Sequence, residues 1–200
     1  IKTFNYVVLM HVFKKKYFLI IENTKDIDLR NIKKRDKFVI IYRNIVSEDN
    51  ILKLKRFRTL CKSKNILFFV ANDIDLAISL HSDGLYLSAK NINFRSLSQR
   101  TNKFRIIGSA HNFREIDIKK RQGCDLILLS RLFKVSYKQN QSFLGIIKFN
   151  NYSLKYNNLL IPLGGIDSSN ISKLKSVKSN FLALMSEVKK KPAKIFSRLF

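Results

Sequence analysis

Two consecutive glycines follow one apolar run of this 200-residue chain and precede a group of short polar residues, in the segment Leu163-Gly164-Gly165-Ile166-Asp167-Ser168-Ser169-Asn170. Glycine allows a backbone to approach an anion closely, and the free N–H groups that open a helix attract negative charge. We therefore predict that Gly164 and Gly165 bind a phosphate group, with Ser186, just after a later apolar run, adding donors. A tight turn without a ligand is the alternative interpretation.

Basic and hydroxyl side chains follow other apolar runs and could bind a second anionic group. Arg43 could bind phosphate oxygens in pairs through its guanidinium, Ser109 could donate a hydroxyl, and Lys138 lies in the longest predicted loop. Exposed side chains without a ligand are the ordinary alternative for the two basic residues. Asp73 either caps the following helix or contacts a metal or ligand, and His111, with no evident carboxylate partner, is interpreted as structural.

Eight apolar, β-rich runs can position these residues. Most are continuously apolar rather than alternating, which is typical of strands buried on both faces in a parallel sheet. Segments with helical spacing lie between several of them. The runs are 17–21, 38–42, 66–70, 84–87, 105–108, 126–129, 159–163 and 181–185, and the helical segments are 49–62, 73–80, 112–121 and 168–177.

This alternation predicts an α/β fold, a small (β/α)₈ or TIM barrel formed by residues 1–200 as one domain. An open, doubly wound sheet is the alternative. Residues 1–13 form a leading segment, expected as a helix or strand, which is too short and too interrupted by polar residues to cross a membrane. Ligands of such barrels bind at the C-terminal ends of the strands, and phosphates recur after strands seven and eight. The glycine pair follows the seventh run.

The charge and cysteine content limit the function classes. The net charge of +25 is compatible with nucleic-acid binding, but lysines are spread over every segment and no compact basic patch with interleaved aromatics occurs. We interpret the charge as a compositional bias and keep nucleic-acid binding as a remote alternative. Cys61 and Cys124 have no metal-ligand spacing, which predicts core thiols in a reducing, cytoplasmic compartment. The sequence is compatible with a homo-oligomer.

Several short motifs, in order, resemble the thiamine phosphate synthase and TenI family over about residues 60–188. Each motif is weak alone, and the ordered set is more specific. The first is similar to the family's A-D-G-V-H-L. The motifs are Ser82-Asp83-Gly84-Leu85-Tyr86-Leu87, Ile107-Gly108-Ser109-Ala110-His111-Asn112, Gly123-Cys124-Asp125 with Leu129-Ser130 and Phe133, and Leu163-Gly164-Gly165-Ile166.

The resemblance implies a barrel that joins an aminopyrimidine diphosphate to a thiazole phosphate, so that small phosphorylated thiamine precursors are its expected ligands. Two positions depart from the family's diphosphate motif, because Ile41 and Ile45 stand where the family has Gln and Lys. The positions that match are Arg43, Ser109 and Lys138 for the diphosphate, and Gly164, Gly165 and Ser186 for the thiazole phosphate.

The resemblance also implies Mg²⁺ held by two carboxylates, and here the match is poor. A one-residue gap makes Asp73 the first ligand, whereas an ungapped match places the family's Asn-Asp pair on Ala71 and Asn72. The second ligand falls on Asn91, whose neutral amide is a poor substitute for a carboxylate. The histidine of a TenI-type tautomerase falls on Arg131. No residue is assigned as catalytic, and a non-catalytic or regulatory barrel that binds the same phosphates is the alternative.

Overall fold

Eight parallel strands close into a barrel in the computed structural model, which describes residues 16–32, 35–44, 49–99, 101, 103–135, 142–157 and 159–185. Each strand pairs with the next along the chain, and the last strand pairs with the first. The predicted barrel is confirmed, and this closure excludes the open sheet. The strands are β1 Tyr17–Ile21, β2 Phe38–Tyr42, β3 Leu67–Ala71, β4 Gly84–Leu87, β5 Arg105–Ala110, β6 Leu126–Ser130, β7 Leu160–Leu163 and β8 Leu182–Leu184.

The inside of the barrel is filled by apolar side chains from alternate strand positions. Because successive side chains of a strand point to opposite faces, every second residue faces the interior. Phe18 packs against Phe181 edge to face, with ring centroids 6.2 Å apart. The buried interior set is Phe18, Ile20, Val39, Ile41, Phe69, Tyr86, Ile107, Leu126, Leu128, Ile161, Phe181 and Ala183.

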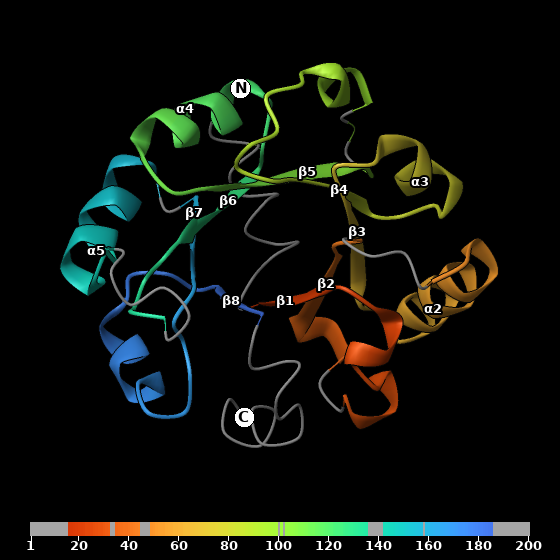
Figure 1. Ribbon diagram of the computed structural model, residues 1–200, viewed down its shortest axis with the longest axis horizontal. Coiled ribbons are helices and arrows are strands. Elements are labelled where there is room, and N and C mark those ends of the chain that lie inside the picture. Colours follow the sequence, from red (N-terminus) through yellow and green to blue (C-terminus); the bar gives the residue numbers. More distant parts are fainter. Residues whose placement is uncertain are drawn as a thin grey trace.

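The α-helices of the described residues lie around the outside of the strands, as Figure 1 shows. They are α2 Ile51–Ser63, α3 Ile74–Ser79, α4 Phe113–Arg121 and α5 Ile146–Lys155. The outward strand side chains and the inner helix faces form a second apolar layer, which explains why the strands are continuously apolar in sequence. Among the described residues, no helix has both the length and the apolar character needed to cross a bilayer.

The Asp83-Gly84 pair holds the barrel together at the N-terminal end of β4. The Asp83 carboxylate accepts hydrogen bonds from the Phe68 N–H at 2.7 Å and from the Arg58 guanidinium at 3.0 Å. A Cβ at Gly84 would lie 1.9 Å from the Arg105 carbonyl oxygen, so only glycine allows β4 and β5 to approach this closely. This motif therefore stabilises the end of the barrel opposite the strand ends where ligands bind.

Two helical segments differ from the expectation. Residues 168–177 form only the short 3₁₀ helix η6, Ile171–Ser176. The side chains of Asp167 and Asn170 accept hydrogen bonds from nearby backbone N–H groups. Such local bonds compete with the backbone hydrogen bonds of an α-helix. Conversely, α5 falls in a segment for which no helix was predicted. Its two asparagines are poor helix formers, and burial of Phe149 and Ser153 stabilises it through tertiary contacts.

Candidate functional site at the C-terminal ends of the strands

The C-terminal ends of all eight strands lie at the same end of the barrel, because the strands are parallel. Along β2 and β5, every second side chain faces the barrel interior, and this alternation continues from the buried apolar positions to polar residues near the strand ends. Arg43 follows Ile41 by two residues, and Ser109 follows Ile107 by two. The alternation therefore directs both side chains toward the mouth of the barrel, where the sequence predicted a binding site.

Arg43 continues the hydrogen-bonding pattern of β2 beyond its last residue. Its backbone N–H donates to the Ile21 carbonyl at 2.8 Å, and its half-buried guanidinium reaches the Met185 sulfur at 4.0 Å. A thioether is a weak acceptor, so this contact leaves most of the guanidinium's donor capacity available for a ligand. Arg43 is thus held at the mouth through its contacts with the ends of β1 and β8.

Tyr86 brings β2, β4 and β5 together at the mouth. Burial raises the pKa of the Tyr86 hydroxyl, while the hydrogen bond with Ser109 and the positive charge of Arg43 oppose that rise. Arg43 and Ser109, predicted separately from sequence, therefore share one neighbour. Tyr86 was not predicted as a site residue, although it occupies the histidine position of the motif that carried the resemblance.

The Gly164-Gly165 turn has a backbone that only glycine adopts at low cost. Both residues have positive φ, 92° for Gly164 and 71° for Gly165. A Cβ at Gly165 would lie 2.4 Å from the Phe133 carbonyl oxygen, because the segment after β6 packs directly on the turn. Within the described part of the chain, the amide N–H groups of Gly164 and Gly165 have no hydrogen-bond acceptor. These amides are the donors a phosphate would need.

The residues after this turn do not supply the helix N-terminus that the sequence predicted. Asp167 N–H donates to the Asn170 side chain at 3.1 Å, and Ser169 N–H donates to the Asp167 carboxylate at 2.8 Å. The Asn170 amide in turn donates to the Gly165 carbonyl. These N–H groups are occupied, so any phosphate binding here depends on the two glycines and on nearby cations.

Arg131, at the end of β6, is one such cation. A Cβ at Gly164 would lie 3.1 Å from Arg131 Cγ, so this side chain lies directly against the glycine turn. From the sequence, this position was considered only as the place of a tautomerase histidine. Its Cβ and Cγ therefore place the stem of a basic side chain beside the predicted phosphate turn, an arrangement that depends on the tertiary packing of β6 against β7.

A histidine and a serine face each other across β5 and β6. His111 Nδ1 lies 2.7 Å from Ser130 Oγ and 3.2 Å from the Ser130 carbonyl oxygen. The carboxylate of Glu115 accepts from the His111 backbone N–H at 2.7 Å and from the Asn112 side chain at 3.0 Å. The Glu115 carboxylate therefore binds the two residues before α4 instead of orienting the imidazole, and the group is not a nucleophilic triad. This agrees with a structural interpretation of His111.

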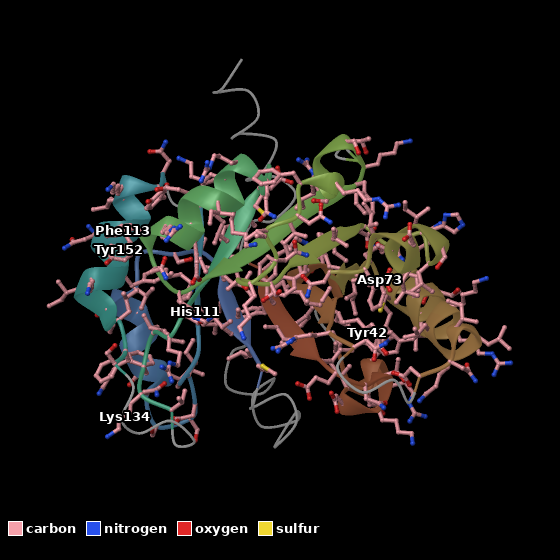
Figure 2. The ribbon with its side chains drawn as sticks, turned by 45° about the horizontal axis from the view of Figure 1, so that its top comes forward. Tyr42, Asp73, His111, Phe113, Lys134 and Tyr152 are labelled. Carbon is pink, nitrogen blue, oxygen red and sulfur yellow. The ribbon has the colours of Figure 1, made fainter. Side chains whose placement is uncertain are left out.

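The residues proposed for Mg²⁺ do not fit that ion. Asp73 caps α3, since its carboxylate accepts from the Leu76 N–H at 2.9 Å, and Figure 2 shows it well apart from His111. The Asn91 amide donates to Asn72 Oδ1 at 3.1 Å, so an N–H₂ group, which cannot bind a cation, faces Asn72. No group of three potential metal ligands among His, Cys, Asp and Glu occurs within the described ranges.

The remaining predicted site residues cannot be placed. Lys138 and Ser186, and also Ile45, lie outside the described residues. Their assignment to the two phosphate sites stays a prediction. The described part of the chain brings together Arg43 and Ser109 on one side of the mouth, and places Gly164 and Gly165 just after strand β7.

Comparisons with known proteins agree with this fold. A thiamine-phosphate synthase from one strain of Prochlorococcus marinus is 33% identical over 153 residues, 75% of this chain and 44% of that protein. An Aquifex aeolicus putative thiamine-phosphate synthase 2 is 28% identical over 76% of this chain and 81% of its own length. The chain spans less than half the length of the first Prochlorococcus relatives that it matches.

A solved structure and a family model complete the comparison. The structure of a thiamine phosphate pyrophosphorylase from Pyrococcus furiosus superposes with a TM-score of 0.70 at 16% identity, over 95% of this chain and 99% of that one, which shows the shared fold. The family model described as thiamine monophosphate synthase matches residues 11–188. The chain therefore belongs to the thiamine monophosphate synthase family.

Proposed function

We propose that the chain joins an aminopyrimidine diphosphate to a thiazole phosphate and releases thiamine phosphate and diphosphate. Family membership supports the reaction class, and the observation that carries the proposal for this chain is the arrangement of the barrel mouth. Arg43 and Ser109 meet at Tyr86 on one side, and the Gly164-Gly165 turn offers free amides after another strand. Two anion sites on one mouth suit two phosphorylated substrates.

In this proposal the residues act by binding and by charge. The Arg43 guanidinium donates a pair of hydrogen bonds to the diphosphate, and the Ser109 hydroxyl donates another. Both stabilise the negative charge that grows as the diphosphate leaves. The amides of Gly164 and Gly165, with the neighbouring Arg131, hold the thiazole phosphate so that the thiazole nitrogen approaches the pyrimidine methylene carbon. The C–O bond to the diphosphate breaks, and the C–N bond to the thiazole forms.

A non-catalytic barrel that binds the same phosphates is the second candidate. The Asn72–Asn91 hydrogen bond favours it, because two amides stand where the resemblance places metal-binding carboxylates. A protein of this kind would bind thiamine phosphate without turning over the precursors. The two functions share the binding residues and differ in product formation alone.

The test measures binding and turnover on the same samples. The chain is incubated with both precursors, thiamine phosphate is detected by oxidation to a fluorescent thiochrome, and thiamine phosphate binding is measured by calorimetry. Arg43→Ala should weaken diphosphate-dependent turnover by roughly 10-fold to 150-fold, the value of one hydrogen bond to a charged group. Arg43→Lys should recover only part of it, since the paired geometry is lost.

A matched control is Arg95→Ala, which removes an exposed guanidinium bonded at the surface to Asp75. It should leave turnover unchanged and so exclude a general effect of net charge. Tight thiamine phosphate binding without product would favour the non-catalytic candidate. Neither product nor binding would refute both proposals.

A cytoplasmic location is part of the same proposal. Its support is that the Cys61 and Cys124 side chains are both buried, as expected of core thiols in a reducing compartment. Burial raises the pKa of the Cys61 thiol to about 12, which makes it unreactive. Assembly into a homo-oligomer stays a prediction.

A further inference from the structure

Asn72 and Asn91 join the end of β3 to the loop after β4 through their side-chain amides. Asn72 Oδ1 accepts two hydrogen bonds, from the Ser88 N–H at 2.9 Å and from Asn91 Nδ2 at 3.1 Å. Asn91 Oδ1 accepts one from the Asn93 N–H at 2.9 Å. Both amide oxygens therefore already accept protein N–H groups.

The surrounding donors fix which way the amide of Asn91 points. If its oxygen and nitrogen were exchanged, the N–H₂ group would face the Asn93 N–H, and the oxygen would face Asn72 Oδ1. Both contacts would then be repulsive, donor against donor and acceptor against acceptor. An N–H₂ group bridging two polar segments is thus the arrangement the geometry requires.

A buried ammonium group on α4 donates hydrogen bonds that hold this loop in place. Lys119, on α4, is 0% exposed, and its Nζ donates to the Asn91 carbonyl and, at 2.8 Å, to Gln122 Oε1. Gln122 Nε2 donates to the Asn91 carbonyl at 3.1 Å and to the Asn93 carbonyl at 2.7 Å. The lysine stem fits because residue 108 is glycine, where a Cβ would lie 2.9 Å from Lys119 Cδ.

We propose that this network takes the structural place of a divalent cation at the mouth of the barrel. The N–H₂ group of Asn91 supplies the positive end that bridges β3 to the β4–β5 loop, and the ammonium of Lys119 fixes that loop to α4. The mouth is therefore assembled without Mg²⁺, and two carboxylates at these positions would create a need for a cation. This inference concerns assembly of the mouth and holds whether or not the chain turns over its substrates.

The network predicts an asymmetry between two conservative substitutions. Asn72→Asp keeps an acceptor opposite the Asn91 amide and opposite the Ser88 N–H, so the melting temperature should stay within about 1 °C. Asn91→Asp replaces the donor by an acceptor that faces Asn72 Oδ1. It should lower the melting temperature by roughly 2–4 °C, the shift that the loss of one such contact produces in a chain of this size.

The decisive variant carries both changes, Asn72→Asp with Asn91→Asp. Two facing carboxylates repel each other, so without a divalent cation the melting temperature should fall below that of either single variant. MgCl₂ should then restore it in a saturable way, whereas the wild type should not respond beyond a KCl solution of equal ionic strength. Binding of Mn²⁺, followed by its electron paramagnetic resonance signal, should appear only in the double variant.

The matched control is Asn65→Asp with Asn157→Asp. Both positions have positive φ, 53° and 52°, close to the 59° of Asn72, and neither belongs to this network. This pair adds the same charge and should gain no Mg²⁺ response. Saturable stabilisation of the wild type by Mg²⁺, or a double variant without any Mg²⁺ response, would overturn the proposal.

Discussion

Gly165→Ala tests whether the glycine turn is specified by its geometry. The added Cβ would lie 2.4 Å from the Phe133 carbonyl oxygen and 2.7 Å from that of Lys134, whereas carbon–oxygen contacts in proteins are about 3.3 Å or longer. The turn and the segment after β6 must separate by roughly 1 Å. We expect this separation to lower both stability and phosphate binding.

The expected loss of stability in Gly165→Ala has two contributions, and a second variant separates them. A backbone conformation that only glycine adopts readily costs another residue roughly 1–3 kcal/mol, and overpacking typically adds about 1–3 kcal/mol. Gly145, with φ 73° and ψ 166°, also has a backbone that other residues rarely adopt, and an added methyl group there would have no atom within 4 Å. Gly145→Ala therefore has only the first cost. Gly165→Ala should melt lower than Gly145→Ala by roughly 2–12 °C.

The assay is thermal unfolding of both variants, followed by calorimetry with thiamine phosphate at a temperature where both are folded. Alanine keeps the backbone N–H, but the shift of the turn should move this donor out of hydrogen-bonding distance of a charged phosphate. Binding should therefore weaken by roughly 10-fold to 150-fold in Gly165→Ala and stay unchanged in Gly145→Ala. Gly165→Ala could instead melt at the same temperature as Gly145→Ala and bind thiamine phosphate equally well. That result would refute both the close packing of the turn on Phe133 and its role in phosphate binding.

Three further substitutions test the capping, packing and buried charge of the barrel. Asn112→Ala removes the N-cap of α4, whose side chain accepts from the Glu115 N–H at 2.9 Å, and should reduce the free energy of unfolding in urea by about 1 kcal/mol; no loss would contradict the capping role. Gly84→Ala places a Cβ 1.9 Å from the Arg105 carbonyl, so its melting temperature should fall by more than that of Gly145→Ala; an equal or smaller fall would contradict the close β4–β5 approach. Burial lowers the pKa of Lys119 from 10.5, so as the pH rises toward 10.5 the unfolded chain holds a proton that the folded chain has released. Urea unfolding of the wild type should therefore gain stability with pH relative to Lys119→Met; a flat or falling difference would contradict it.

Much of the barrel could be predicted from sequence because its strands have a local signature. The runs around Phe38–Tyr42 and Leu126–Ser130 are apolar on both faces, and only a strand between an interior and a helix layer requires that pattern. Helix α5 could not be predicted, because its stability comes from burying Phe149 against the barrel and not from its helix propensity. The 3₁₀ helix η6 shows the reverse, since local side-chain bonds at Asp167 override an apolar period.

The candidate site likewise contains some residues that could be predicted from sequence and others that could not. Arg43, Ser109 and the two glycines could be found from sequence, since strand ends and consecutive glycines are visible along the chain. Tyr86 could not, because its role depends on neighbours from two other strands. Arg131 could not be assigned to the phosphate turn either, because only the packing of β6 beside β7 brings its side chain against Gly164.

The sequence by itself determined the eight strands, their parallel arrangement and the strand ends where anions can bind, because periodicity and glycine placement are local properties. Only the tertiary structure decided how the mouth is held together. It joins the side-chain amides of Asn72 and Asn91 by a hydrogen bond and places the buried Lys119 against the Asn91 carbonyl. Asn91 lies 19 positions from Asn72 and 28 from Lys119 along the chain. No local sequence pattern predicts the contacts of Asn91 with Asn72 and Lys119, since they form only when closure of the barrel brings these segments together.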